Sequence, residues 1–146
     1  VDIANHVRRH FNVTAGPWAI GGLSMGGYGA MRLGLKYPEM FASIWAHSSA
    51  FHIPDRLDPN LVVDIEDARV ITHARKAAAA GTTQVISFDC GVDDDLIVHN
   101  RELHTAMEEL GLPHHYAEHP GAHTWEYWDE HVREALAQHA RVLLDR

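Results

Sequence analysis

The sequence is poor in cysteine and in positive charge, and it contains no long hydrophobic run. Its one cysteine, Cys90, rules out an intramolecular disulfide and a zinc site built on paired cysteines. Twelve lysines and arginines stand against 20 aspartates and glutamates, which gives a net charge of −8 with histidine neutral. This balance argues against a nucleic-acid partner, which usually needs a basic patch. Without a run of about 18 apolar residues, no membrane span is expected.

The composition is that of a folded domain. Hydrophobic residues make up 46 % of the 146 positions, which excludes a disordered chain and allows a core of useful size. We therefore predict a single domain over residues 1–146. A lone cysteine fits a cytoplasmic protein better than an exported one, so a cytoplasmic location is expected.

Short apolar runs alternate with stretches of helical periodicity. Strands are predicted over residues 18–20, 41–46, 84–88 and 114–118. Helices are predicted over residues 3–11, from 30 to just before Pro38, over 68–80, around 96–110 and over 128–143. The last of these is predicted from the spacing of Trp128, Val132, Leu136 and Leu143. Such alternation is typical of an α/β fold with a mostly parallel sheet and helices on both faces. Residues 47–61, with two prolines and several aspartates and histidines, are predicted to form a loop excursion.

The segment from Gly22 to Gly26 has the pattern G-x-S-x-G, which is typical of the nucleophile turn of α/β-hydrolases. Ser24 would project from a sharp turn between a strand and a helix. Gly22 and Gly26 would remove side chains that collide with the neighbouring strand and helix. The N–H of Met25, at the start of that helix, is the natural donor to an oxyanion. A plain packing turn is the alternative, whereas phosphate-loop and dinucleotide-binding patterns do not fit the spacing.

The residues that complete this chemistry are expected where the later strands end. A serine hydroxyl needs a base to take its proton, and the base needs a carboxylate to orient it. They follow in the order serine, acid, histidine, and catalytic groups collect at the carboxyl ends of parallel strands. Asp93, Asp94 and Asp95 follow the third strand, and His123 follows the fourth. The residues alone leave open which aspartate faces His123, and at least one is expected to cap the next helix.

A metal site is the other interpretation of the histidines near the end of the chain. His115, His119 and His123 are spaced four apart, as two ligands on one face of a helix would be. The first two fall on a predicted strand and its exit, where helical geometry does not apply, and no carboxylate has suitable spacing beside them. We therefore expect no metal at these three histidines, and no cofactor.

Three segments resemble one family of α/β-hydrolase esterases. Residues 22–30 resemble its nucleophile region, residues 90–96 its acid segment and residues 120–125 its histidine segment. The family includes S-formylglutathione hydrolase (esterase D), tributyrin-type esterases, feruloyl and acetyl-xylan esterases, and mycolyltransferases. The tributyrin-type esterases look most similar. In this family the catalytic aspartate falls three residues after the glycine, which implies Asp94, with Asp93 as the second choice.

The resemblance implies a serine carboxylesterase that hydrolyses short-chain acyl esters or thioesters through an acyl-enzyme. Ser24 would be the nucleophile, His123 the base and Asp94 the acid that orients it, with the oxyanion held by Met25. Phe51 and the aromatic Trp125 would wall the acyl pocket. The rival interpretations are an acyltransferase or peptidase on the same fold, or an inactive hydrolase fragment that serves as an interaction piece.

The sequence departs from the family in one respect. Family members begin well upstream of the nucleophile turn, so the resemblance covers their carboxyl-terminal portion, apparently without the amino-terminal strands. Strands 18–22 and 42–46 are then expected to lack neighbours on one side. We expect the isolated chain to be impaired unless an amino-terminal segment complements it, because that part would supply a second oxyanion donor. An exposed sheet edge also predicts self-association into a homo-oligomer.

Overall fold

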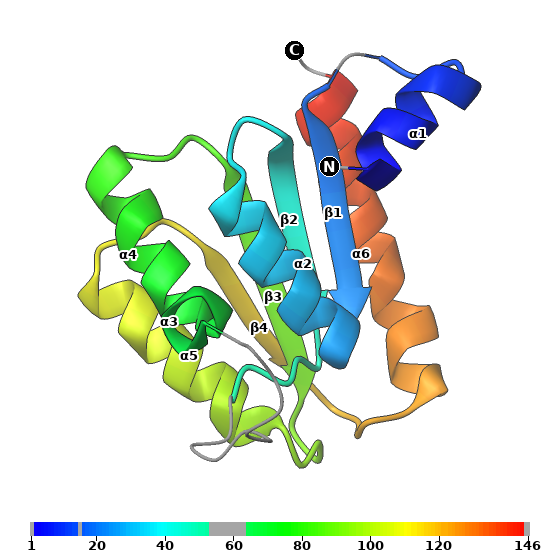
Figure 1. The fold of residues 1–146 in the computed structure, drawn as a ribbon. Coiled ribbons are helices and arrows are strands. Elements are labelled where there is room, and N and C mark those ends of the chain that lie inside the picture. The colour runs from blue at the N-terminus through cyan, green and yellow to red at the C-terminus, as the bar shows by residue number, and fades with distance from the viewer. Residues whose placement is uncertain (1, 15, 53–63, 145–146) are drawn as a thin grey trace.

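The computed structural model describes residues 2–14, 16–52 and 64–144. In them a parallel sheet has the strand order β1-β2-β3-β4. The strands are β1 Trp18–Leu23, β2 Phe41–His47, β3 Val85–Gly91 and β4 His115–His119. The helices are α1 Asp2–His10, α2 Met25–Lys36, α3 Ile65–Ala68, α4 Val70–Ala80, α5 Ile97–Glu109 and α6 Trp125–Leu144. Helices α2, α4 and α5 lie on one face of the sheet and α6 lies on the other (Figure 1).

The sheet confirms the predicted parallel alternation and corrects one expectation about its edges. Strand β2 pairs with β1 on one side and with β3 on the other. The prediction that the strand over 42–46 lacks a neighbour is therefore wrong, because the later strand β3 fills that side. Within the described residues, β1 pairs only with β2, so its second edge carries unpaired backbone groups.

The apolar core lies between the sheet and the helices of the first face. Ile44, Ala46, Ile86 and Phe88 point into it from the two central strands. The helices contribute Met31, Leu35, Val70, Ala74, Ala77, Leu103 and Met107. Each large side chain buried in this way stabilises the fold by roughly 1.5–3 kcal/mol. Gly34 lets α2 approach the sheet closely, because a Cβ there would lie 2.5 Å from Ile44 Cδ1.

The opposite face of the sheet is polar and is held to α6 by hydrogen bonds. Gln138 Nε2 donates to Ser43 Oγ at 3.0 Å and to the carbonyl of Ile44 at 3.1 Å. The last helix was predicted from apolar residues that include Val132 and Leu136. The structure confirms the helix, but those two side chains are 38 % and 61 % exposed, because the buried face carries Tyr127, Trp128, His131, Ala135 and Gln138.

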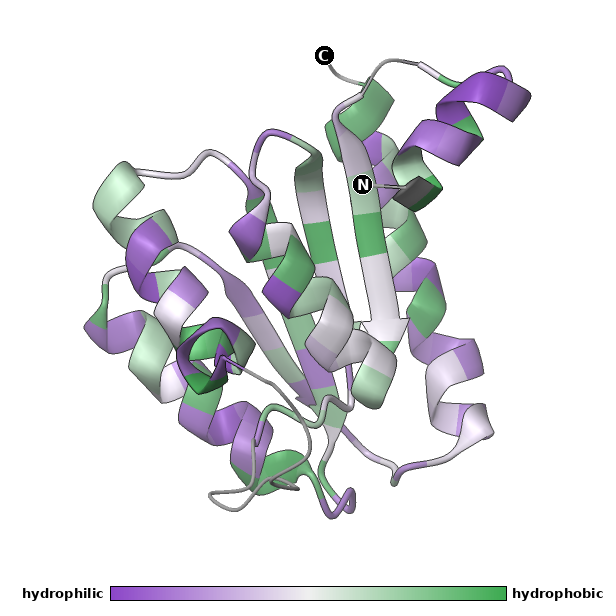
Figure 2. Ribbon diagram, in the orientation of Figure 1, coloured by the Kyte–Doolittle hydropathy of each residue, from purple (hydrophilic) through white to green (hydrophobic). Residues whose placement is uncertain are grey.

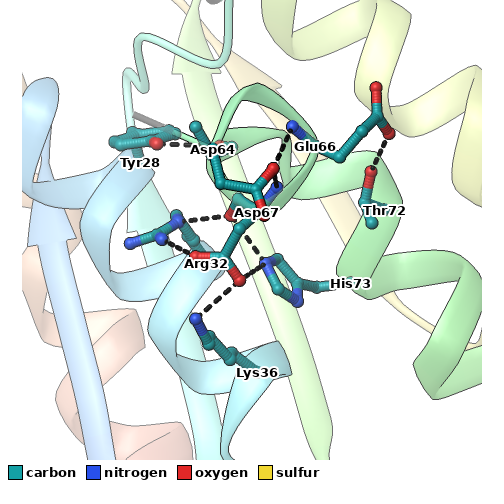
Figure 3. A network of polar contacts seen from close by, with 9 residues as sticks. Tyr28, Arg32, Lys36, Asp64, Glu66, Asp67, Thr72 and His73 are labelled. Carbon is teal, nitrogen blue, oxygen red and sulfur yellow. Dashed lines mark hydrogen bonds and ion pairs between the residues drawn. The ribbon is translucent and has the colours of Figure 1, made fainter. Parts of the chain in front are cut away.

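The helix predicted over 68–80 is confirmed as α4, but it begins only at Val70, because the short helix α3 ends at Ala68 and the chain is extended at Arg69 (φ −76°, ψ 122°). The Asp64 carboxylate caps α3 by accepting the N–H groups of the residues two and three positions later. Asp67 is held by Lys36 at 2.6 Å and by Arg32, both on α2 (Figure 3). The hydrogen bond from Lys36 is the main reason that the pKa of Asp67 lies below its ordinary value. This tertiary network fixes α3 against α2.

The segments outside the sheet and its core are α1, the residues after β2 and the end of α4. Helix α1 is mostly hydrophilic (Figure 2), and its Ile3 side chain is 82 % exposed. His47 belongs to β2, residues 48–52 follow that strand, and residues 53–61 of the predicted excursion lie outside the described part. Gly81 ends α4 in the left-handed conformation. No helix in the described part of the chain is long and apolar enough to cross a membrane.

Candidate active site

Ser24 occupies a sharp turn between the end of β1 and the start of α2. Its backbone is in the positive-φ region (φ 56°, ψ −121°), which is rare for a residue with a side chain. The Ser24 N–H donates to the carbonyl of His47 at 2.9 Å, and its carbonyl accepts the N–H of Tyr28 at 3.1 Å. These bonds hold the strained conformation, which sets the hydroxyl at the carboxyl edge of the sheet.

Glycines make this turn possible, but not all at the predicted positions. A Cβ on Gly22 would lie 2.4 Å from the carbonyl oxygen of Gly26, so that position confirms the predicted steric need. A Cβ on Gly26 would meet no described atom within 4 Å, so the predicted clash there is wrong. The crowding falls instead at Gly27, where a Cβ would lie 2.0 Å from Ser49 Oγ. The helix therefore turns its second glycine toward the loop after β2.

Three of the side chains predicted from sequence come together in one hydrogen-bonded chain. His123 Nε2 lies 3.0 Å from Ser24 Oγ, and His123 Nδ1 lies 2.8 Å from Asp94 Oδ2. An ionised carboxylate only accepts, so Nδ1–H donates to Asp94 and Nε2 is left to accept the hydroxyl proton of Ser24. The Asp94 side chain is fully buried, whereas that of His123 is 35 % exposed. The ring therefore has one side held by the protein and one side open to a substrate.

Burial distinguishes the three adjacent aspartates. Asp94 is buried, while Asp93 and Asp95 are exposed. Asp94 Oδ1 also accepts the N–H of Leu96 at 2.8 Å, at the start of α5. One carboxylate oxygen thus holds the turn before α5, and the other faces His123. The expectation that one of the three aspartates caps the helix is wrong, because the N-cap position is Leu96.

The start of α2 supplies a donor beside Ser24. Met25 is the first residue of that helix, so its N–H has no acceptor within the helix. The helix dipole adds partial positive charge at this end, which favours an anion. The Met25 side chain is 78 % exposed. The backbone of Met25 can therefore donate to an oxyanion while its side chain borders the site.

The loop that carries His123 packs directly on the end of β3. A Cβ on Gly91 would lie 2.3 Å from the carbonyl oxygen of Gly121. We expect Gly91→Ala to push this loop away, to lower kcat/KM by about 100-fold through misplacement of His123, and to cost about 1–3 kcal/mol of stability. Esterase assays and urea unfolding measure the two effects.

Gly29→Ala is the matched control for that substitution, because a Cβ on Gly29 meets no described atom within 4 Å. In the middle of α2 the added methyl group should stabilise the helix by about 0.5–1 kcal/mol and leave activity in place. Equal activities of the Gly91→Ala and Gly29→Ala variants would contradict the packing role of Gly91.

The aromatic residues predicted to line the substrate pocket lie in different surroundings. Trp125 is 73 % exposed and its ring contacts Trp128 at 5.2 Å between centroids. Trp128 is buried and lies edge-on to the His123 ring at 4.8 Å, so it supports the imidazole. Phe51 contacts Phe88 of the core edge-on at 5.8 Å and lines a cavity of about 320 Å³ between α4 and α5. A substrate role for Phe51 and Trp125 stays a prediction.

The histidines spaced four apart do not gather at one point. His123 contacts Ser24 and Asp94, and His115 lies 6.5 Å from the Trp45 ring. His119 instead stacks on His131 of α6, with ring centroids 4.1 Å apart. His115, His119 and His123 therefore have different neighbours, as expected for residues on a strand and its exit rather than on one face of a helix.

Cys90 is a free, buried cysteine in β3, and we expect its thiol to be unreactive. It is fully buried in β3, and burial, with a smaller contribution from the charge of Asp94, raises the pKa of its thiol to about 12. The thiolate is the reactive form of cysteine, so we expect almost no alkylation of the native protein at about pH 8. Iodoacetamide labelling in buffer and in guanidinium, followed by intact mass, measures this. Rapid labelling of the native chain would contradict the burial of Cys90.

Sequence reasoning missed two buried residues, Asn100 and Asp89, whose hydrogen bonds hold the elements around the site together. Asn100 Nδ2 donates to the carbonyl of Ser49 at 3.0 Å, which ties α5 to the loop after β2. Asp89 is buried and accepts from Trp45 Nε1 at 2.6 Å and from the Tyr127 hydroxyl at 2.7 Å. A charged residue inside the apolar run of β3 was the available signal for Asp89. Asn100 gave none, because one amide in a polar helix is ordinary.

Known proteins identify the family to which this fold and turn belong. The sequence pattern of the family described as “Putative esterase” matches residues 2–139. The chain belongs to this Esterase family. An acetyl esterase of Caldicellulosiruptor saccharolyticus is 32 % identical, and the match covers 84 % of this chain and 54 % of that protein. The chain thus spans about half the length of that curated relative.

Solved structures agree with the Esterase family fold. A ferulic acid esterase matches with a TM-score of 0.83 at 27 % identity, over 97 % of this chain and 59 % of the other. An S-formylglutathione hydrolase of Staphylococcus aureus matches with a TM-score of 0.81 at 23 % identity, over 94 % of this chain and 60 % of the other. The second likeness bears on the fold alone. The chain has the α/β-hydrolase fold.

Proposed function

We propose that this chain carries the catalytic centre of a serine carboxylesterase that cleaves short-chain acyl esters or thioesters. The hydrogen-bonded chain from Ser24 Oγ through His123 to Asp94 is the observation that carries the proposal. Membership of the Esterase family supports the reaction class. The N–H of Met25 at the helix start supports an acyl-transfer mechanism, which develops negative charge on the carbonyl oxygen.

In the first half of the proposed reaction, the acyl group moves to Ser24. The hydroxyl oxygen attacks the carbonyl carbon of the substrate while His123 Nε2 takes the hydroxyl proton. Asp94 stabilises the imidazolium that forms, and Met25 N–H donates to the oxyanion. The tetrahedral intermediate then expels the alcohol or thiol, which takes its proton from His123. The product of this half is an ester between the acyl group and Ser24.

In the second half, water takes the place of the leaving group. His123 Nε2 removes a proton from the water as it attacks the acyl-enzyme carbonyl. The second tetrahedral intermediate collapses to a carboxylic acid, and His123 returns the proton to Ser24 Oγ. The exposed side of the His123 ring provides the approach that water requires.

Short acyl groups are proposed from the surface around the nucleophile. Met25 and Trp125 are both exposed, and each follows closely on a residue of the hydrogen-bonded chain. They offer a limited apolar contact to an acyl group. The relative from Caldicellulosiruptor saccharolyticus is named an acetyl esterase, which supports the same preference.

We propose that full activity depends on an amino-terminal segment of the kind that the relatives have and this chain does not span. Removing one oxyanion donor typically costs about 10²–10³ in rate. We therefore propose that the chain alone turns over slowly and that a complementing amino-terminal segment supplies a second donor. The unpaired edge of β1, as seen among the described residues, is the place where added strands or a second copy would pair. The cytoplasmic location stays a prediction.

A substrate panel tests the proposed reaction. Initial rates would be measured with p-nitrophenyl acetate, butyrate and laurate, with S-formylglutathione and with a peptide p-nitroanilide. We expect the highest kcat/KM on a short ester or thioester. Faster cleavage of the anilide would favour a peptidase, and acyl transfer to added alcohol in preference to water would favour an acyltransferase. Absence of turnover on all of them by folded protein would contradict the proposal.

A further inference from the structure

His119, His131 and Glu134 form a cluster of side chains that the proposed esterase mechanism does not use. His119 is the last residue of β4, and the other two lie one turn apart on α6. One ligand atom from each lies within 4.8 Å of the other two, and no other such group occurs in the described residues. His131 Nδ1 lies 3.1 Å from Glu134 Oε1. Two separate elements thus bring two imidazoles and a carboxylate together.

One ring nitrogen in this cluster has no partner in the part of the chain that the structure describes. His119 Nε2 is buried and has no hydrogen-bond partner among the described residues. A buried polar atom of this kind typically costs about 1–3 kcal/mol unless something satisfies it. Tyr127 contacts both rings, at centroid distances of 6.5 Å and 4.5 Å, but its hydroxyl proton is donated to Asp89. The hydroxyl beside the two imidazoles is therefore already engaged.

The chemistry of the three side chains selects the kind of ion. Two imidazole nitrogens and one carboxylate are a ligand set typical of Zn²⁺ and related transition metals. Ca²⁺ and Mg²⁺ prefer oxygen ligands and are disfavoured here. Zn–N and Zn–O distances of about 2.0–2.2 Å require ligand atoms roughly 3.4 Å apart. The His119 and His131 rings are stacked, with centroids 4.1 Å apart, so both rings must tilt to aim a nitrogen at one ion. Glu134 is 46 % exposed and can rotate toward the same point.

We propose that His119, His131 and Glu134 bind a zinc-class ion, with water at the fourth position. The ion would fasten the end of β4 to α6. The loop between these two elements carries His123, so both of its ends would be tied to one centre. The ion stabilises this loop and takes no part in bond cleavage. Binding and stability report on the site directly, so it can be tested independently of the esterase reaction.

Zinc titration of matched variants tests the site. The protein would carry no histidine tag, since a tag would add further zinc ligands to the 13 histidines of the chain. Calorimetry would compare Glu134→Gln with Glu130→Gln, an exposed glutamate one turn earlier on the same helix. We expect at least a roughly 10-fold weaker affinity in the first variant and wild-type affinity in the second. Thermal unfolding should show a zinc-dependent rise in Tm that Glu134→Gln loses.

The histidine ligands are tested by His119→Asn, with circular dichroism to establish that the variant is folded. Cobalt(II) titration gives a second measurement, because the intense visible absorption of four-coordinate cobalt should appear in the wild type and be lost in both ligand variants. Equal zinc affinities for wild type, Glu134→Gln and His119→Asn would overturn the proposal. A wild-type protein with no zinc site tighter than non-specific binding to other side chains would overturn it as well. In that case His131 Nδ1 and Glu134 form only a hydrogen bond.

Discussion

Replacing Ser24 with alanine is expected to lower kcat on a short-chain ester by about 10⁴–10⁶, which leaves only weak residual hydrolysis. The hydroxyl is the only group of the protein that bonds to the acyl carbon in the proposed mechanism. Without this hydroxyl, His123 has no serine nucleophile to deprotonate, although the Met25 N–H can still donate to an oxyanion. Steady-state assays with p-nitrophenyl acetate, together with thermal unfolding, measure the effect. Removing this one hydroxyl should leave the fold intact.

Ser49→Ala provides the control for Ser24→Ala. Ser49 lies on the loop after β2, and its buried hydroxyl donates to the carbonyl of His47 at 3.2 Å rather than to His123. Loss of that hydroxyl should leave most of the activity. If Ser24→Ala and Ser49→Ala retained similar turnover, Ser24 would not be the nucleophile, however well its geometry fits.

Replacing Asp94 with asparagine should have the second largest effect, a fall in kcat of about 10⁴. Asparagine can still accept the N–H of Leu96, so the turn before α5 keeps this hydrogen bond. The lost carboxylate no longer stabilises the imidazolium, and an amide NH₂ facing His123 Nδ1 favours the wrong tautomer. Rates measured at saturating substrate give kcat, and so separate the loss in the chemical step from any change in substrate binding.

Asp93→Asn and Asp95→Asn are the natural comparisons, because both side chains are exposed neighbours with the same charge. Each removes one negative charge from the same loop, so electrostatic changes common to the loop are matched. We expect activity close to wild type in both. Small and equal effects in all three variants would show that no carboxylate of this loop orients His123.

The parts of the site that depend on strand ends could be predicted from the sequence. Ser24, Asp94 and His123 each follow the carboxyl end of a strand, and parallel strands bring those ends to one edge. The choice of Asp94 over its neighbours needed the resemblance to the family. Local spacing cannot tell which of three adjacent carboxylates turns inward, whereas burial can.

Features that arise from contacts between distant elements could not be predicted. The break at Arg69 depends on Asp67 meeting Arg32 and Lys36 of α2, which propensity within the segment does not reveal. The crowding at Gly27 depends on Ser49 across the turn. In each case the partner is set by tertiary packing, which overrides local preference.

The polar packing of α6 was missed for a related reason. Apolar periodicity is the usual signal for the buried face of a helix, and it pointed to Val132 and Leu136. The buried face is instead satisfied by hydrogen bonds such as those from Gln138 to the second strand. The cluster of His119, His131 and Glu134 also involves α6, and its residues come from two separate segments.

The most direct test of the proposed nucleophile is covalent labelling with a fluorophosphonate, which traps an activated serine without turnover. Intact mass spectrometry counts the adducts, and peptide mapping locates them. We predict a single adduct, on Ser24, which forms much more slowly in His123→Gln and is absent in Ser24→Ala. Folded protein that stays unlabelled, or that is labelled equally after the loss of Ser24, would contradict the assignment of Ser24 as the nucleophile.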